Sequence, residues 1–173
     1  MTLLAVTVVG HDRPGIIAEA TGLLAALGAN LEDLSMTRLR GHFAMMLVAS
    51  ADAVPAEVEA ALTPLTADGT LAVTVRQVPV EAAPAATSGP GYLLSVHGGD
   101  RPGIVSAVTA EVAASGGNIT DLTTRLTGDL YVLVAEVDLP PGADADGLTG
   151  RLRAVGDELG VQVSLRPLEP DLL

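Results

Sequence analysis

The chain has 173 residues, a formal net charge of −12 and no cysteine, which excludes disulfides, thiol catalysis and zinc sites built on thiolates. Nine basic residues spread among 21 acidic ones disfavour direct nucleic-acid binding, because a phosphate backbone selects for clustered cations. No stretch approaches the roughly 20 apolar residues of a membrane span and no basic segment opens a signal peptide, so we expect a soluble, cytoplasmic protein that does not bind membranes.

The first half of the chain predicts six elements in the order βαββαβ. Apolar residues recur at helical spacing after Pro14, and Gly28 is the expected residue beyond the end of that helix. Arg40-Gly41-His42 is typical of a tight turn between two antiparallel strands. The predicted elements are a strand at 3–9, a helix at 14–27, strands at 30–39 and 43–49, a helix beginning at Pro55 and a strand at 71–78.

The second half repeats the first. Asp12-Arg13-Pro14-Gly15-Ile16-Ile17 returns 88 residues later as Asp100-Arg101-Pro102-Gly103-Ile104-Val105. Over the 24 positions that begin at these two aspartates, 12 are identical, against about two expected by chance. After one deletion in the second copy, Thr37-Arg38-Leu39 aligns with Thr124-Arg125-Leu126. The second copy predicts strands at 92–97, 118–127, 130–138 and 161–166, and helices at 102–114 and 144–159.

We interpret the chain as a tandem duplication of one small domain. The first domain takes residues 1–79, a linker rich in Ala, Pro, Ser and Gly takes 80–91, the second domain takes 92–168, and 169–173 form a tail. The element order predicts an α+β fold, a ferredoxin-like split βαβ unit with four antiparallel strands and both helices on one face of the sheet. Because the other face is left bare, we expect the two copies to cover one another by edge or face pairing.

The loop before the first helix of each copy has residues suited to binding an anion. Asp12 and Asp100 can cap the helix, and a proline suits its first turn. Gly15 and Gly103 let a ligand or another backbone come close to the helix N-terminus. The exposed amides there favour a carboxylate as well as a phosphate.

The pattern Asp-Arg-Pro-Gly-Ile, followed eighteen residues after its Asp by an Asn that opens the second strand, resembles the ACT domain, a small regulatory module that binds amino acids. The resemblance covers both copies, and a chain of two such units is similar to the glycine cleavage system transcriptional repressor group. It implies that an amino acid lies between two units, against the first loop of one, held by loop amides and by the Asn after the first helix. The implied residues are Gly10, His11, Asp12, Arg13, Pro14, Gly15, Ile16, Ile17, Asn30 and Leu31 in the first copy, and Gly98, Gly99, Asp100, Arg101, Pro102, Gly103, Ile104, Val105, Asn118 and Ile119 in the second.

The sequence departs from the family at one position. Some members that bind small polar amino acids place a His two residues before the Asp, where this chain has Gly10 and Gly98. Structural interpretations also stand for the other residues. The aspartates can serve only as helix caps, Asn30 and Asn118 can serve only to tolerate a left-handed bend, and the two arginines are expected to be solvated or paired with acids.

Catalytic and metal sites are not predicted. The three histidines are too scattered for a metal site, and His42 is expected on a hairpin turn. No Ser/His/Asp grouping can be proposed from the spacing, and the glycine-rich patches lack the lysine of a nucleotide-binding loop. We therefore expect no enzyme activity, no metal and no cofactor.

The leading hypothesis is a non-enzymatic amino-acid sensor that binds its ligand at ACT–ACT interfaces, forms a homodimer and signals through a regulatory protein partner, without direct contact to nucleic acid. The alternative is a ligand-independent ACT-like dimerisation scaffold, which the missing His favours. The sequence leaves open which amino acid binds and whether one or both loops are occupied.

Overall fold

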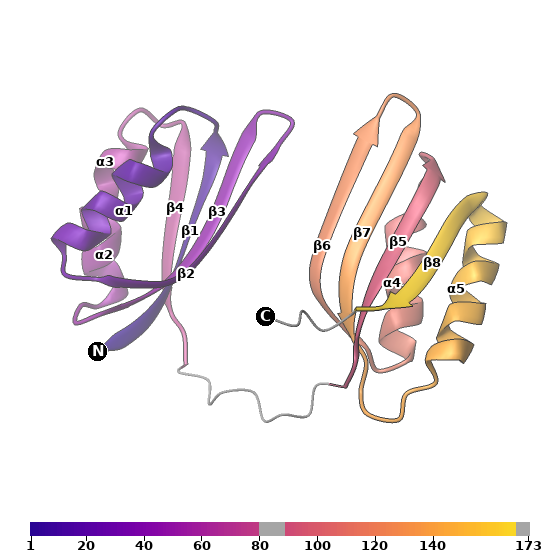
Figure 1. Ribbon diagram of the computed structural model, residues 1–173. Helices are drawn as coiled ribbons and strands as arrows, with labels where there is room; N and C mark the ends of the chain where they lie inside the picture. The colour runs from indigo at the N-terminus through magenta and orange to yellow at the C-terminus, as the bar shows by residue number, and fades with distance from the viewer. Residues whose placement is uncertain (80–88, 169–173) are drawn as a thin grey trace. The chain divides into compact units, whose positions relative to one another are not determined.

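Apolar residues alternate along the strand segments and recur at helical spacing in the segments that connect them. The strands form two four-stranded sheets, each with its own helices. The computed structural model describes residues 1–79 and 89–168, which fall into two units on either side of the gap (Figure 1). Of the predicted linker and tail, residues 80–88 and 169–173 lie outside the described residues.

Each unit has the predicted order of elements, with one helix of the first unit divided in two. The first unit consists of β1 (Thr2–His11), α1 (Ile16–Ala26), β2 (Asn30–Leu39), β3 (His42–Ala51), α2 (Pro55–Ala61), α3 (Thr63–Thr66) and β4 (Leu71–Gln77). The second consists of β5 (Gly91–Gly99), α4 (Ile104–Ala114), β6 (Asn118–Thr127), β7 (Leu130–Asp138), α5 (Ala145–Leu159) and β8 (Val161–Pro167).

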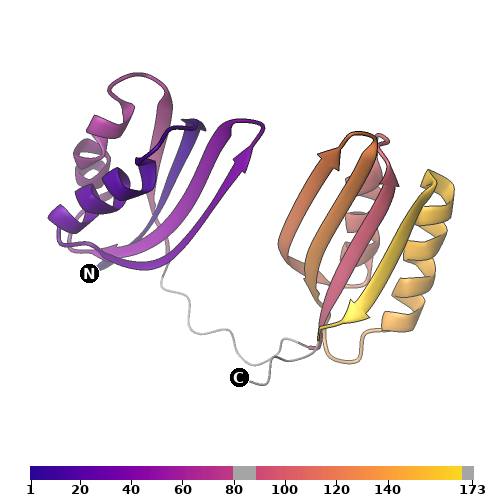
Figure 2. The ribbon, with the colours of Figure 1, turned by 45° about the horizontal axis from the view of Figure 1, so that its top comes forward.

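The strands are antiparallel in the orders β2-β3-β1-β4 and β6-β7-β5-β8. The turned view shows that the helices of each unit cover one face of its sheet (Figure 2). The α+β, ferredoxin-like fold class is therefore confirmed. Among the described residues, no helix is both long and apolar enough to cross a bilayer.

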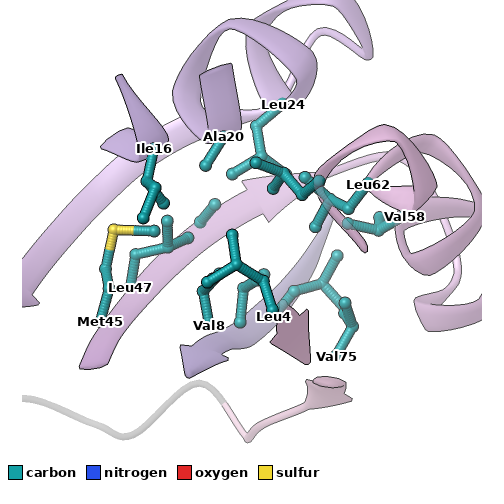
Figure 3. Packing of buried hydrophobic residues seen from close by; sticks show 14 of the residues in the cluster. Leu4, Val8, Ile16, Ala20, Leu24, Met45, Leu47, Val58, Leu62 and Val75 are labelled. Carbon is teal, nitrogen blue, oxygen red and sulfur yellow. The ribbon is translucent and has the colours of Figure 1, made fainter. Parts of the chain in front are cut away.

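The core of the first unit lies between the sheet and its helices and is almost wholly aliphatic (Figure 3). The central strands β1 and β3 contribute every second residue, and the helices contribute residues three or four apart. The labelled members are Leu4, Val8, Ile16, Ala20, Leu24, Met45, Leu47, Val58, Leu62 and Val75. A separate core of the same character fills the second unit.

The ends of α1 and α4 are made by glycines. Gly28 has φ +74 and its amide donates to the Ala25 carbonyl, while the Ala29 amide donates to the Leu24 carbonyl. This pair of hydrogen bonds is the Schellman arrangement, and Gly116 ends α4 in the same way. The prediction that Gly28 follows the helix end is confirmed.

The helix predicted from Pro55 is broken into α2 and α3. Pro64 lies at the start of α3 and has no amide to donate to the preceding turn, so one continuous helix cannot form there. Leu62 and Leu65 are nevertheless fully buried. The equivalent helix of the second unit, α5, has no proline and runs unbroken for 15 residues.

The two hairpins have the same length, which corrects the predicted deletion. Leu39 pairs with His42 across Arg40-Gly41, and both turn residues have positive φ, 49° and 84°. The second hairpin also turns through two residues, since Thr127 pairs with Leu130. The offset between the copies therefore stays at 88 through both hairpins, and Leu126, not Arg125, occupies the position of Arg38. His42 belongs to β3 and is not a turn residue.

Candidate functional site

The first loop of unit 1 is fixed by its neighbours. A Cβ on Gly10 would overlap the carbonyl oxygen of Thr70, so only glycine allows β1 to approach β4 here. The His11 amide donates to that same carbonyl at 3.0 Å, and the Asp12 amide donates to the Gly41 carbonyl at 3.2 Å. Two neighbouring turns thus hold the backbone of the loop.

The helix that follows begins without a side-chain cap. Gly15, with φ 88, is the N-cap residue, and no side chain accepts from the first turn. Asp12 lies too early to cap, so the predicted aspartate cap is wrong, and Pro14 lies in the turn before the helix. The same holds for Asp100 and Pro102 before α4, whose N-cap is Gly103. The first amides of each helix therefore have no acceptor within it.

The side chains at the start of each helix divide into buried and exposed ones. Ile16 and Ile104 are 1% and 2% exposed and belong to the cores, so only their amides are available to a ligand. The next residues, Ile17 and Val105, are exposed. The helix N-terminus thus offers amides beside one apolar side chain in each copy.

Ion pairs tie the charged residues of the first loop to its own unit. Arg13 donates to Glu19 at 2.8 Å, and Arg38 donates to Asp12 at 3.2 Å. Pairing with an acid was one of the two roles expected for Arg13. Its Nε is buried without a hydrogen-bond partner among the described residues.

Asp68 forms the neighbouring turn. The Thr70 hydroxyl, at 2.7 Å, and then the Thr70 amide, at 2.9 Å, donate to its carboxylate and hold the pKa of Asp68 below its usual range. The positive charge of Arg13 acts in the same direction.

The second loop lacks these ion pairs. Ala107 replaces Glu19, and Leu126 replaces Arg38. Within residues 1–79 and 89–168, neither Asp100 nor Arg101 forms an ion pair, and both are exposed. The two loops therefore have the same backbone shape, but within the described part of the chain the charged side chains are ion-paired in the first loop and exposed without ion pairs in the second.

Asn30 and Asn118 lie far from the loop of their own unit. Asn30 opens β2 and pairs with Ser50, which in turn pairs with Leu3 at the start of β1. The loop follows His11 at the other end of β1, eight residues away, which corresponds to about 26 Å of strand. Among the non-glycine residues described, only Arg40 has positive φ, so the suggested left-handed bend at the asparagines is wrong.

The predicted site residues thus form two groups at opposite ends of each sheet. Gly10 to Ile17 lie at one end, and Asn30 with Leu31 lies at the other. In the second unit, Gly98 to Val105 and Asn118 with Ile119 divide in the same way.

A groove that sequence reasoning missed lies along the first helix of each unit. In unit 1 it has a volume of about 480 Å³ and in unit 2 of about 470 Å³. Small residues on the outer face of the helix, such as Gly22 and Ala110, were the available signal. The lining residues are Ala18, Thr21, Gly22, Leu24, Ala25, Ala29, Leu31 and Ala49 in unit 1, and Ser106, Thr109, Ala110, Val112, Ala113, Gly117, Asn118 and Ile119 in unit 2.

Two histidines meet at the loop end of the first sheet. The rings of His11 and His42 stand edge to face with their centroids 6.5 Å apart. No group of three His, Asp or Glu side chains suited to a metal ion occurs in the part of the chain that the structure describes.

Comparison with known proteins places both units in one family. The family model for the ACT domain matches residues 2–76 and 92–166. A UPF0237 protein of Methanopyrus kandleri is 52% identical over 48 residues, which are 28% of this chain and 53% of that relative. The chain thus spans about half the length of this curated relative and of a similar one from Streptococcus pneumoniae.

Two solved structures resemble the whole chain. An unknown protein from Galdieria sulphuraria has a TM-score of 0.80 at 30% identity and covers 97% of this chain and 99% of its own. A putative glycine cleavage system transcriptional repressor has a TM-score of 0.68 at 20% identity, with 98% of each chain covered, which shows a shared fold.

Proposed function

The chain belongs to the ACT domain family as a tandem of two such domains, and from that membership we propose that it is a non-enzymatic regulatory protein. It binds a free amino acid where two ACT units meet and passes the signal to a protein partner. The resemblance to the repressor group supports the regulatory part of this proposal.

The separation of the two groups of site residues carries the proposal. One amino acid cannot reach from the Gly15 amides to Asn30 of the same unit, because the 11-residue helix α1, about 16 Å long, lies between them. It can contact both kinds of group when the loop of one unit meets the asparagine end of another. Binding then depends on how two units are arranged, and a ligand that prefers one arrangement shifts the population toward it.

The groups available suit the two ends of an amino acid. The uncapped amides at the start of α1 or α4 favour the ligand carboxylate. The side-chain carbonyl of Asn30 or Asn118 can accept from the ligand ammonium group. The groove beside each asparagine is lined mainly by apolar atoms and has room for a small apolar side chain. We therefore propose a small or aliphatic amino acid as the ligand.

Calorimetric titration of the full chain against each of the twenty amino acids tests this proposal. The double variant Asn30→Ala, Asn118→Ala is expected to lose binding at least tenfold while keeping its far-UV circular dichroism spectrum. A matched control replaces Glu32 and Thr120, the exposed residues at the bulges of β2 and β6, with alanine, and it should bind like the wild type. Flat titrations of the folded wild type with all twenty would overturn the sensor proposal.

One observation favours the alternative, a ligand-independent dimerisation scaffold. The family His has no place here, because a Cβ on Gly10 would overlap Thr70 and a Cβ on Gly98 would lie 2.8 Å from Val161 Cγ1. A chain that stays dimeric but binds none of the amino acids would support the scaffold.

A further inference from the structure

The sheet of unit 1 has a second face, opposite its helices, that the unit itself leaves uncovered (Figure 1). We call it the open face of unit 1 and define it by the outward residues of the four strands. Met46 and Val9 are 52% and 51% exposed near its centre. Its central strands contribute Leu3, Ala5, Thr7, Val9, Ala44, Met46, Val48 and Ser50, none of them charged, and at the loop end the pair His11 and His42.

The equivalent face of unit 2 is more polar. His97 replaces Val9, Glu136 replaces Val48, and Arg125 replaces Thr37. The two copies share the loop motif and the core pattern, so this difference is confined to residues that face outward. The face of unit 1 is the more apolar of the two, so leaving it in contact with water costs more free energy, which favours a partner there.

Asp33 and Arg76 are charged residues in the outward register of the described strands, and they lie at the two outer edges of the open face and in one row. Asp33 on β2 pairs with Val48, Val48 pairs with Ala5, and Ala5 pairs with Arg76 on β4. The row therefore runs from an acid at one edge to a base at the other. A twofold axis parallel to the strands places β2 over β4 of the opposing sheet, and thus Asp33 opposite Arg76 at both edges.

We propose that the open face of unit 1 packs against the same face of a second copy of this chain. Such pairing buries aliphatic side chains in the centre and brings two Asp33–Arg76 pairs together at the rim. Unit 2 has the same row, from Asp121 through Glu136 and Leu93 to Arg166. It is nevertheless a poorer partner for this face, because the extra charge of Glu136 in the middle of that row would be buried opposite aliphatic residues. The proposal concerns a surface separate from the ligand site and does not depend on ligand binding.

The area and shape of the face fit this partner. Four strands about 4.8 Å apart and up to ten residues long cover about 600 Å² in projection. A standard interface buries about 800 Å² of accessible surface per partner, and protruding side chains bring the face close to that value. A hollow of about 390 Å³ beside Met46 offers room for the flexible methionine of the opposing copy.

Charge exchange tests the proposed pairing. Asp33→Arg and Arg76→Asp, made singly, should each weaken dimerisation by about tenfold in sedimentation equilibrium, because each converts two attractive pairs into repulsive ones. The double variant should restore the wild-type association. Equal weakening in the double variant, or no effect of either single change, would overturn the proposal.

Cross-linking identifies which surface meets the open face. Because the chain has no cysteine, a single Met46→Cys change gives one reactive thiol. A short bis-maleimide should then yield a covalent dimer of the full chain, whereas the matched variant Val134→Cys, at the equivalent position of unit 2, should remain monomeric on a denaturing gel. Absence of the Met46→Cys dimer would overturn the proposal. So would a cross-link within one chain in the double variant Met46→Cys, Val134→Cys, because it would place the face of unit 2 against the open face of unit 1.

A variant that carries residues of unit 2 on the open face tests the same surface without a cross-linking reagent. Val9→His with Val48→Glu introduces the residues that the second unit tolerates at the same positions, so the fold should be kept. Dimerisation through the open face should fall by at least tenfold. If this variant still binds an amino acid in calorimetry, ligand binding does not depend on the open face. Unchanged dimerisation would contradict the proposed pairing of open faces.

Discussion

Gly10 is required by a close approach of the backbone. Its Cα faces the Thr70 carbonyl, which also accepts from the His11 amide, so an added methyl group must push β1 and β4 apart. We expect Gly10→Ala to lower the free energy of unfolding of the first unit by about 2 to 3 kcal/mol. Far-UV circular dichroism during urea denaturation measures this change.

The control for that substitution lies in the same unit. Gly22 is in the middle of α1 with ordinary helical geometry and nothing within 4 Å of an added Cβ. Gly22→Ala should raise the free energy of unfolding by about 0.5 to 1 kcal/mol, because alanine restricts the unfolded chain more. A similar loss in both variants would mean that the Thr70 contact is not the cause.

Asp68 gives the first unit a pH dependence with a defined sign. Hydrogen bonds from Thr70 lower its pKa in the folded state, so the carboxylate stabilises the fold at a pH above the unfolded pKa. This contribution is lost as the pH falls through the folded pKa, below the usual range for aspartate. The variant Asp68→Asn should therefore lose less stability than the wild type between pH 5 and about pH 3. Parallel acid titrations followed by circular dichroism would show the two curves converging, and curves of equal slope would contradict the prediction.

At the level of elements, the helices begin in two different ways. The side chain of Asp144 accepts from the Gly147 amide at 2.8 Å and caps α5, whereas α1 and α4 have no side-chain cap. We expect Asp144→Ala to lower the free energy of unfolding of the second unit by about 1 kcal/mol, and Asp144→Asn to cost only a few tenths. Tyrosine fluorescence suits this measurement, since Tyr92 and Tyr131 both lie in the second unit. Equal losses in the two variants would show that the acceptor is unimportant.

The order of the elements follows from local signals, and their ends do so only in part. Strand alternation, helical spacing and Gly28 act within a few residues, so the order and the helix ends were predictable. The start of α1 was misplaced because Pro14 and Gly15 form a turn of their own before the helix. The break after α2 was missed because Leu62 and Leu65 keep a buried pattern on both sides of it.

The candidate site was predictable as a set of residues but not as an arrangement. The loop and the asparagine are eighteen residues apart in sequence, yet the length of β1 separates them in space. The different ion pairs of the two loops depend on residues from other elements, Glu19 and Arg38. A repeated motif alone does not show that the second copy lacks both of these partners.

For the whole molecule, the duplication yields two units with separate cores that have diverged on their surfaces. The described hydrophobic clusters share no residue, and the Leu62 and Leu148 side chains each lie wholly within one of them. Each unit is therefore expected to unfold largely on its own contacts, with any pairing between surfaces adding a smaller coupling.

Core substitutions in the full chain test this independence. Leu148→Ala should shift the urea transition seen by tyrosine fluorescence by about 2 to 5 kcal/mol, because it leaves a cavity in the second core. Leu62→Ala, equally buried in the first core, should leave the tyrosine transition in place and shift only the circular dichroism component of the first unit. The tyrosines lie in the second unit alone, so the two signals separate the units within one protein. If both variants moved both signals together, the chain would unfold as a single cooperative body, and contacts between units would contribute as much as the two cores.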